Sequence, residues 1–456
     1  MIKTVYNVWK ELSPATRLLC KIALVNLIVI NLLLIIVLST PVAETIISKL
    51  KTFFLVKGGS VTWEVLSSAY DYVSSHFQKP VYSEFFFDKK IKLQYPPTTL
   101  LLLSPFKIPI VANGLEIFSV SLYKVLNLVS WVLLIVTIYL VIRIFNLSKD
   151  RYLVGESNFV SKRDQIVSGI VIFCLSLSFY PLLRAYEAKQ IHIWVTFFIT
   201  LSFWLWLKRS HKFSGALMGL VCLVEPQYLA VFVWGVIRRH KVFSLTGIFT
   251  YGIGLILSIL LFGWLNHINF LEVLAFVARH GEGFYPNQSV NGLLNRLLFN
   301  GNNLVWSDSF PPYHPVVYWS SIISSAILLG IAFFAFRKTS EMTSAADFLS
   351  IILASTMACP VVWELNYTVL LPVYAYLTPW LLHQKFSGRT LIAWLFLASY
   401  LLTSNYLIAA NRLAGSPILN LAQSYLFFGA LLAFFILQKA RNLHTEPEPK
   451  SFDFVE

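Results

Sequence analysis

The sequence predicts an all-α protein that crosses a membrane many times. Of its 456 residues, 57% are hydrophobic and 13% are charged, whereas an average soluble domain carries about 25% charged residues. The mean hydropathy is +0.68, and apolar runs close to the roughly 20 residues that a helix needs to cross a bilayer recur along the chain. These observations exclude a soluble protein and predict a polytopic membrane protein.

The net charge of +14 is explained by membrane topology. Lys and Arg stand in short clusters between the apolar runs, as in Lys208-Arg209 and Arg238-Arg239, which is typical of cytoplasmic loops. We therefore expect membrane lipids as partners and no nucleic acid. The four cysteines have no metal-ligand spacing, which predicts neither zinc nor disulfides.

The apolar runs predict ten full spans and one helical hairpin, so about 10–12 membrane helices with both termini in the cytoplasm. The first run, 22–38, is too long for a signal peptide and is expected to remain as a span. The other spans are expected at 118–143, 166–182, 191–207, 242–265, 316–336, 345–358, 367–382, 391–407 and 419–437. Because the run 213–237 has basic clusters at both ends, we expect it to bend at Glu225-Pro226 and return to the cytoplasmic side.

Residues 1–444 are expected to form a single transmembrane domain, followed by a polar cytoplasmic tail over residues 445–456. Two long segments should lie outside the membrane. The first extracytoplasmic loop covers residues 41–115, and the second covers residues 266–313. The first loop is rich in aromatic residues but too polar to span throughout, so we expect it to lie against the membrane surface.

An amphipathic helix in the first outer loop carries the candidate general base. Apolar residues recur at helical spacing over Val61–Phe77, and Glu64 and Asp71 lie on another face. Seven residues are almost two turns, so the two carboxylates project in nearly the same direction. A carboxylate there suits removal of a proton from a substrate. The alternative is two solvated acids on the polar face of an interfacial helix.

Further polar residues stand at the outer boundaries of the spans. Arg184 and Lys189 are cations on the outer side, which indicates either a site for an anionic group such as phosphate or anchoring to lipid head groups. Glu364 and Asn366 lie between two spans, where an acid is costly unless it faces a cavity or a partner. The second outer loop offers a mixture of amides and cations that suits sugar hydroxyls and phosphates. Its members are Arg279, His280, Asn287, Gln288, Asn291 and Arg296.

Several common enzyme motifs are absent from the sequence. There is no P-loop, GxSxG or HExxH motif, which excludes the usual nucleotide hydrolases and zinc proteases. Few charges lie within the central parts of the spans, which disfavours an ion pump.

Four sets of motifs resemble those of a known family. Glu64 is followed by Tyr82 at eighteen positions, and the segment QYPPTTLLLLSPF begins at Gln94. AKQIHIW, which contains Gln190 and His192, precedes the hairpin GALMGLVCLVEPQYLAVFVW. NQSVNGLLNRLL and CPVVWELNYTVLLP follow later. In order and spacing these segments resemble the GT-C membrane glycosyltransferases and, within them, glycosyltransferase family 87, the polyprenol-phosphate-mannose-dependent mannosyltransferases.

The resemblance implies a GT-C-like bundle with interfacial helices in the first outer loop. It also implies a polyprenyl-phosphate-linked donor of a hexose such as mannose, a lipid-linked or other glycan acceptor, and no nucleotide or metal cofactor. The transfer would be inverting, with Glu64 as the base and Asp71 as its rival. Arg184, Lys189 and Arg296 would hold the donor phosphate. The residues expected at the sugar or acceptor are Gln190, His192, His280, Asn287, Gln288, Asn291, Glu364 and Asn366.

Three positions depart from the family pattern and leave alternatives open. Glu64 stands where the family commonly has Asp, Glu225 where it has Lys, and Asn366 where it has His. A transporter or flippase of a lipid-linked or polar substrate is one alternative, and an inactive homologue that acts as a partner subunit is another. The polar candidates gather on the outer face, which favours an enzyme with an extracytoplasmic active site over a transporter. The absence of long targeting segments suits a bacterial inner membrane, with an internal membrane as the alternative.

Overall fold

The computed structural model confirms the all-α fold. It describes residues 9–38, 61–76, 79–107, 111–112, 115–116, 122–152, 161–335, 341–383, 389–407 and 416–442. The two described strands, β1 (Val111–Ala112) and β2 (Leu115–Glu116), form one short antiparallel pair. The expected cytoplasmic tail and residues 41–60 of the expected first loop lie outside the described residues.

Four described helices are long and apolar enough to cross a membrane alone. They are α2 (Pro14–Leu38), α6 (Leu122–Tyr152), α12 (Lys241–Phe262) and α15 (Pro315–Phe334). In α2, α12 and α15, only 22% of the most apolar stretch is buried, so most of that surface faces outward, as lipid contact requires. The chain is therefore an integral membrane protein.

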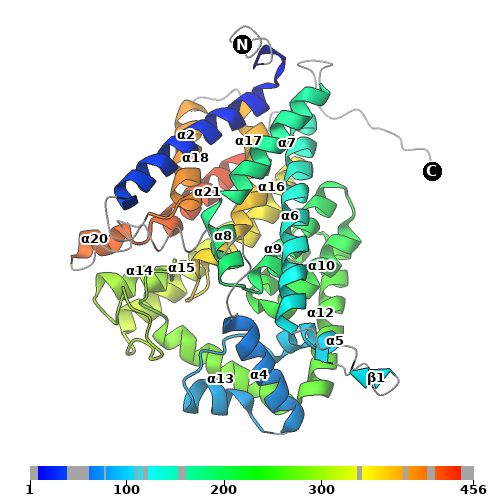
Figure 1. Ribbon diagram of the computed structural model, residues 1–456, viewed down its shortest axis with the longest axis vertical. Coiled ribbons are helices and arrows are strands. Elements are labelled where there is room, and N and C mark those ends of the chain that lie inside the picture. The colour runs from blue at the N-terminus through cyan, green and yellow to red at the C-terminus, as the bar shows by residue number, and fades with distance from the viewer. Residues whose placement is uncertain are drawn as a thin grey trace.

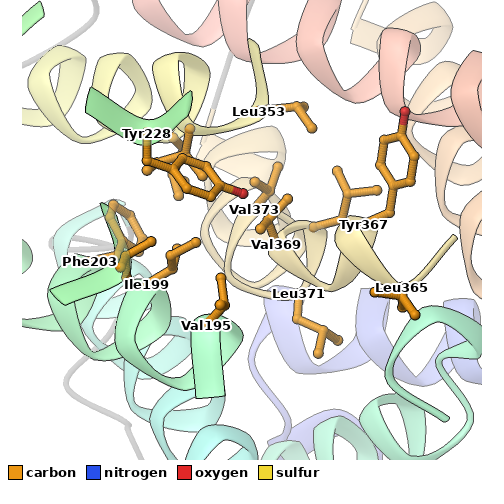
Figure 2. Close-up of a cluster of buried hydrophobic side chains, with 14 of the residues drawn as sticks. Val195, Ile199, Phe203, Tyr228, Leu353, Leu365, Tyr367, Val369, Leu371 and Val373 are labelled. Atoms are coloured by element: carbon orange, nitrogen blue, oxygen red, sulfur yellow. The ribbon is translucent and has the colours of Figure 1, made fainter. Parts of the chain in front are cut away.

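Shorter apolar helices occupy the other expected spans. They are α9 (His192–Leu207), α16 (Glu341–Met357), α17 (Leu370–His383), α18 (Arg389–Ser404) and α21 (Tyr425–Asn442). Residues 345–357 of α16 are almost all buried, and residues 370–381 of α17 are buried throughout, because a helix that is apolar on all sides packs inside a bundle. Figure 2 shows part of this core, in which side chains of α9 face those of α17 and of the turn before it.

The hairpin is confirmed, with its break at the expected residue. It consists of α10 (His211–Val224), the 3₁₀ turn η3 (Pro226–Leu229) and α11 (Ala230–Ile237). The rings of His211 and His240 at its two ends lie 6.0 Å apart, so both legs start and finish at the same end of the molecule. Glu225 lies at the opposite tip.

Two expected spans are wrong in their extent. The span predicted at 166–182 is divided into α7 (Lys162–Leu177) and α8 (Tyr180–Glu187), which are bent by 56°, because Pro181 starts a new helix. The span predicted at 419–437 is divided into α20 (Pro417–Ala422) and α21. Residues of the expected second loop, 266–313, form hydrogen bonds to the two residues at this break. Gln288 Nε2 donates to Gln423 O at 2.8 Å, and Arg296 Nη2 donates to Ser424 Oγ at 2.7 Å.

The segments expected to lie outside the membrane form short helices where the structure describes them. They comprise α4 (Val61–Ser75), the π-helical turn η1 (Ser83–Asp88), the 3₁₀ segment η2 (Pro97–Leu102), α5 (Ser104–Lys107), α13 (Trp264–His280) and α14 (Val290–Leu297). In Figure 1, α4, α5 and α13 lie at the lower end of the molecule. The two outer segments are joined by a buried ion pair between Lys92 Nζ and Glu282 Oε2 at 2.6 Å. Lys92 also lies over the ring of Trp306, 4.2 Å from its centroid.

Basic residues gather at the other end of the molecule. Lys149, at the end of α6, pairs with Asp164 of α7 at 2.7 Å. Asp347 lies between Arg238 and Arg441, at 2.8 and 2.5 Å. These basic residues lie at the end of the bundle where α10 begins at His211, and the tip of the hairpin lies at the other end of α10. The basic clusters and Glu225 therefore occupy opposite ends of the bundle.

Candidate active site

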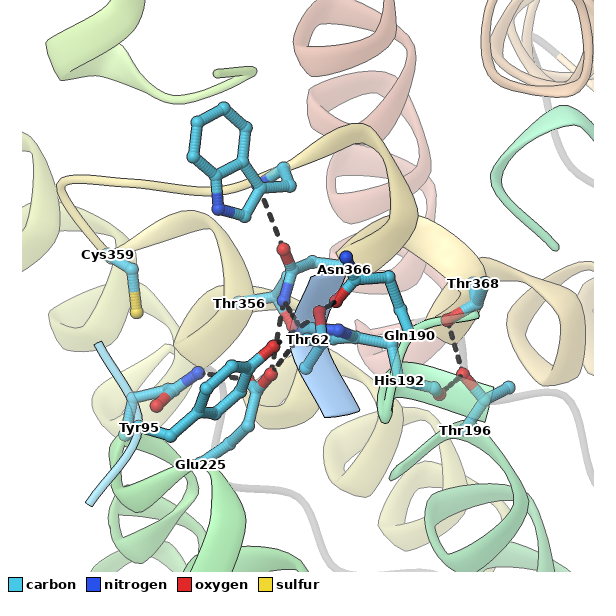
Figure 3. Close-up of polar contacts among 12 residues, drawn as sticks. Thr62, Tyr95, Gln190, His192, Thr196, Glu225, Thr356, Cys359, Asn366 and Thr368 are labelled. Atoms are coloured by element: carbon cyan, nitrogen blue, oxygen red, sulfur yellow. Dashed lines mark hydrogen bonds and ion pairs between the residues drawn. The ribbon is translucent and has the colours of Figure 1, made fainter. Parts of the chain in front are cut away.

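Polar side chains from five separate segments meet at the tip of the hairpin (Figure 3). Thr62 comes from α4, Tyr95 from the segment before η2, and Glu225 from the break after α10. Gln190 and His192 come from the start of α9. Asn366 comes from η4 (Glu364–Val369), the 3₁₀ turn before α17. Each of these segments holds one of the motifs that the sequence singled out, so the motifs converge in space.

Glu225 is the centre of this polar cluster. Its Oε1 lies 2.5 Å from His192 Nε2 and accepts a hydrogen bond of 3.3 Å from Asn366 Nδ2. Its Oε2 accepts a hydrogen bond from Gln227 Nε2. Glu225 and His192 are buried, whereas Gln227 and Asn366 are half-buried. The carboxylate is therefore held by three donors in a cluster that borders the solvent.

Gln190 connects the cluster to the first outer segment. Its Oε1 accepts a hydrogen bond of 2.6 Å from Thr62 Oγ1 and a longer one of 3.4 Å from Tyr95 OH. Tyr82 supports the same segment, because its hydroxyl donates to Tyr95 O at 2.6 Å. The tyrosine of the first motif thus fixes the backbone of the second.

The segment after Tyr95 also fixes the tip of the hairpin. Thr98 and Thr99 both donate to Leu223 O, the latter at 3.3 Å. This carbonyl belongs to the last turn of α10, where the helix itself supplies no donor. Two threonine hydroxyls therefore cap the helix that ends at Glu225.

A second polar group lies on the other side of η4. Tyr180 OH donates to Glu364 Oε2 at 2.7 Å, and Arg184 Nε lies 4.0 Å from the same oxygen. Arg184 Nη1 also pairs with Glu187 Oε2 at 3.0 Å. The Arg184 side chain is 34% exposed and lies against two carboxylates, those of Glu187 and Glu364. Glu364 and Asn366 connect the two groups because they are two residues apart in η4.

Lys189 and Glu64 border the cluster. Lys189 directly precedes Gln190, and Glu64 lies two residues after Thr62 and is exposed. Burial lowers the pKa of Lys189, and the negative charge of Glu64 opposes this shift. The two charges therefore lie within electrostatic reach of each other at the edge of the cluster.

Asp71 lies on the same helix as Glu64 but is held differently. Both carboxylate oxygens accept hydrogen bonds from Lys107 Nζ, at 2.8 and 2.9 Å, and the side chain is 61% exposed. The expected amphipathic helix is confirmed, because Trp63, Leu66 and Val73 of α4 are buried. Asp71 itself makes its contact with α5, away from the residues around Glu225.

The candidates of the second outer loop hold that loop together. Asn287 bonds to the backbone at Glu282, Pro360 and Val362. Gln288 Nε2 donates to Tyr285 O at 2.7 Å, and Asn291 Oδ1 accepts from Glu282 N at 3.2 Å. His280 Nδ1 lies 2.9 Å from Pro311 O. All of these contacts except that of His280 are made by buried side chains.

Arg296 is also buried inside this loop. Its Nη1 donates to Asn287 O at 2.9 Å, and burial lowers its pKa to about 9. The negative charge of Glu364 opposes that shift. The guanidinium therefore faces backbone carbonyls, whereas Arg184 and Lys189 lie nearer to the solvent.

The sequence patterns did not single out six residues of these two groups as site residues: Thr62, Tyr95, Tyr180, Glu187, Glu225 and Gln227. Tyr95 and Glu225 stand inside the quoted motifs, where prolines suggested turns. The signal that was available is the carboxylate of Glu225 in the middle of an apolar run, since an acid at that depth requires partners.

Comparison with known proteins assigns the family. The model of glycosyltransferase family 87 matches residues 93–362, more than half of the chain. The chain belongs to glycosyltransferase family 87. It is therefore a membrane glycosyltransferase, and the match includes Tyr95, Gln190, His192 and Glu225 of the cluster. The comparisons found no match among curated proteins or solved structures.

A member of glycosyltransferase family 87 uses sugar donor and acceptor substrates. Within the described part of the chain, no group of three His, Cys, Asp or Glu side chains could hold a metal ion. The site instead combines cations at the start of α9 and in α8 with amides, a histidine and carboxylates. This combination can bind a phosphate and sugar hydroxyls and can accept a proton.

Proposed function

We propose that this protein transfers a hexose such as mannose from a polyprenyl-phosphate carrier to a lipid-linked or other extracytoplasmic glycan acceptor. The observation that carries the proposal is the convergence of Tyr95, Gln190, His192, Glu225 and Asn366 at one end of a membrane bundle. A lipid carrier presents its sugar at the membrane surface, where these residues lie between short interfacial helices and the ends of the spans. The expected GT-C-like bundle belongs to the same proposal.

The distribution of charge suits a sugar phosphate. Arg184 and Lys189 provide positive charge on the α8 side, where they would hold the donor phosphate and neutralise it as it leaves. Gln190, His192 and Asn366 provide groups that can bind sugar hydroxyls. Arg296 would act on the donor phosphate through its charge and from a greater distance, because its guanidinium already donates hydrogen bonds to backbone carbonyls. His280, Asn287, Gln288 and Asn291 would shape the loop over the sugar or acceptor.

The reaction needs one base. The acceptor oxygen forms a bond to the anomeric carbon, the bond between that carbon and the phosphate oxygen breaks, and the electron pair leaves with the phosphate. Glu64 would take the acceptor proton, and the configuration at the anomeric carbon would invert. Two observations support Glu64 over Asp71: the charge of Glu64 acts on Lys189, which precedes Gln190 of the cluster, whereas Asp71 is paired with Lys107 of α5.

Transfer assays on the purified full-length chain test this proposal. We expect radiolabelled polyprenyl-phosphate hexoses to be cleaved and their sugar transferred to lipid-linked glycans by the wild type. Glu64→Gln should reduce the rate at least about 100-fold, as loss of a general base does, while Asp71→Asn retains most of it. Glu84→Gln, a neutralised acid elsewhere on the outer face, is the matched control.

Three outcomes would contradict the proposal. A wild type that cleaves no such donor would indicate an inactive partner subunit. Movement of the intact donor across a vesicle membrane without cleavage would indicate a transporter or flippase. Normal transfer by Glu64→Gln would show that another group is the base.

A further inference from the structure

Glu225 is a buried carboxylate that the mechanism above leaves without a role. Its residue is 5% exposed, yet it lies at the centre of the polar cluster rather than in the apolar core. His192, Asn366 and Gln227 direct donors at its two oxygens. Burial of a carboxylate is costly unless hydrogen bonds stabilise it, and here three side chains and the capped end of α10 fix it in place.

The donors around Glu225 are neutral. Asn366 and Gln227 are amides. His192 Nδ1 is buried and has no hydrogen-bond partner within the described part of the chain, whereas its Nε2 lies 2.5 Å from Glu225 Oε1 and 2.9 Å from Asn366 Nδ2. A neutral imidazole with its proton on Nε2 donates to Glu225, and the Asn366 amide then donates to Glu225 and not to His192. Within the described part of the chain, the side chains that bond to the Glu225 carboxylate are two amides and an imidazole, so hydrogen bonds hold it and no Lys or Arg pairs with it.

The amide of Asn366 is oriented toward Glu225 by the backbone. Asn366 Oδ1 accepts a hydrogen bond of 2.8 Å from Trp363 N, which turns Nδ2 toward Glu225 and His192. The hairpin tip is also held by Tyr228 OH, which lies 2.9 Å from Thr356 Oγ1. The carboxylate therefore cannot reorient easily, which is the property required of a preorganised charge.

Glycosyl transfer develops positive charge on the reacting sugar. As the bond to phosphate breaks, the anomeric carbon and ring oxygen acquire oxocarbenium-ion character. We infer that Glu225 is a catalytic residue that contacts the donor sugar and stabilises this positive charge, with His192, Asn366 and Gln227 as its positioning residues. The inference rests on the proposed function. Glu225 takes up no proton in this step, because the acceptor proton goes to Glu64 and the electron pair goes to the phosphate.

Neutralisation of Glu225 tests its role in the rate. Glu225→Gln keeps the shape of the side chain and one acceptor oxygen but removes the charge. We expect kcat to fall about 100-fold, which is the range for loss of one preorganised electrostatic group. The KM for the donor should stay nearly unchanged. Glu225→Asp retains the charge and should recover part of the loss. Glu84→Gln should behave as the wild type. An unchanged kcat in correctly folded Glu225→Gln, judged by gel filtration, would overturn the inference.

A binding measurement separates the charge effect from turnover. Polyhydroxylated piperidines are protonated at neutral pH and imitate the positively charged sugar ring, whereas the corresponding lactams are neutral. Calorimetry measures the affinity for each compound. We expect the wild type and Glu84→Gln to bind a hexose-configured piperidine at least about tenfold more tightly than the corresponding lactam, a difference of about 1.4 kcal/mol. Glu225→Gln should lose this preference.

The two measurements fail in different ways. If the wild type cleaves no donor, the proposed function is wrong, whatever the piperidine result. If the wild type transfers sugar but Glu225→Gln keeps both its kcat and its preference for the piperidine, only the role of Glu225 is wrong. A Glu225→Gln variant that loses stability but keeps kcat would show a structural carboxylate and would also overturn the inference.

Discussion

At the scale of single residues, Asn366 shows how side-chain orientation is set by the backbone. Its oxygen is occupied by Trp363 N–H, so its Nδ2 is available to donate to Glu225 Oε1 at 3.3 Å. His192 Nε2 lies 2.9 Å from the same Nδ2. An amide can accept on one side and donate on the other, which neither a carboxylate nor a hydrophobic residue of that shape can do.

Asn366→Asp should therefore damage the site. The substitution replaces the hydrogen-bond donor Nδ2 of Asn366 by an oxygen. It also places a second carboxylate beside that of Glu225, and like charges repel. We expect transfer to fall at least about tenfold and the free energy of unfolding to fall by about 1–3 kcal/mol, the cost of an unsatisfied buried group. Assays of transfer and of thermal unfolding in detergent measure both.

Asn302→Asp is the matched control. Asn302 is exposed, and its Oδ1 only accepts, from Leu304 N at 3.0 Å and Val305 N at 2.9 Å. A carboxylate can do the same, so activity and unfolding should stay at wild-type values. Equal losses in both variants would mean that the orientation of Asn366 is unimportant.

At the scale of elements, the hairpin brings a carboxylate to the end of the bundle opposite the basic clusters. Its first leg, α10, packs against α12 through small residues. A Cβ added at Gly219 would meet Gly247 O at 2.6 Å and Thr250 Cβ at 2.8 Å. Close approach of the two backbones thus sets the position of α10, and with it the position of Glu225.

Gly219→Val should displace the hairpin without touching the site. Overpacking of this kind costs about 1–3 kcal/mol of stability, and a shift of about 1 Å at the tip can reduce kcat about 100-fold. Gly252→Val is the control, because a Cβ at Gly252 has nothing within 4 Å. Full activity of Gly219→Val would show that the tip of the hairpin does not depend on this packing.

The sequence predicts elements better than it predicts their contacts. In the described part of the chain the expected spans fall on helical segments, two of them divided in two, and the bend at Glu225-Pro226 is confirmed, because apolar length and proline are local signals. The break before α21 is not local, since Gln423 and Ser424 are held by residues more than a hundred positions earlier. For the same reason, Gln190, His192 and Asn366 could be singled out from the sequence, but their meeting with Glu225 could not.

At the scale of the whole molecule, charge is divided between the two ends. Buried ion pairs such as Lys149–Asp164 and Arg238–Asp347 lie at one end, and the cluster around Glu225 lies at the other. The positive-inside rule predicts that the basic end faces the cytoplasm. The site would then open on the extracytoplasmic side, where a lipid-linked donor can be used without a nucleotide.

Cysteine labelling in intact cells tests this orientation. In a background without Cys20, Cys174, Cys222 and Cys359, single cysteines replace Asp88 of η1 or Lys208 after α9, both of which are exposed. We expect a membrane-impermeant maleimide to label Asp88→Cys in intact cells and Lys208→Cys only after permeabilisation. The reverse pattern would put the site in the cytoplasm, and labelling of both in intact cells would contradict the division of the molecule into two membrane faces. With the proposed roles of Glu64 and Glu225, the donor sugar would reach both carboxylates from the same face, so the result also decides on which side of the membrane the donor is presented.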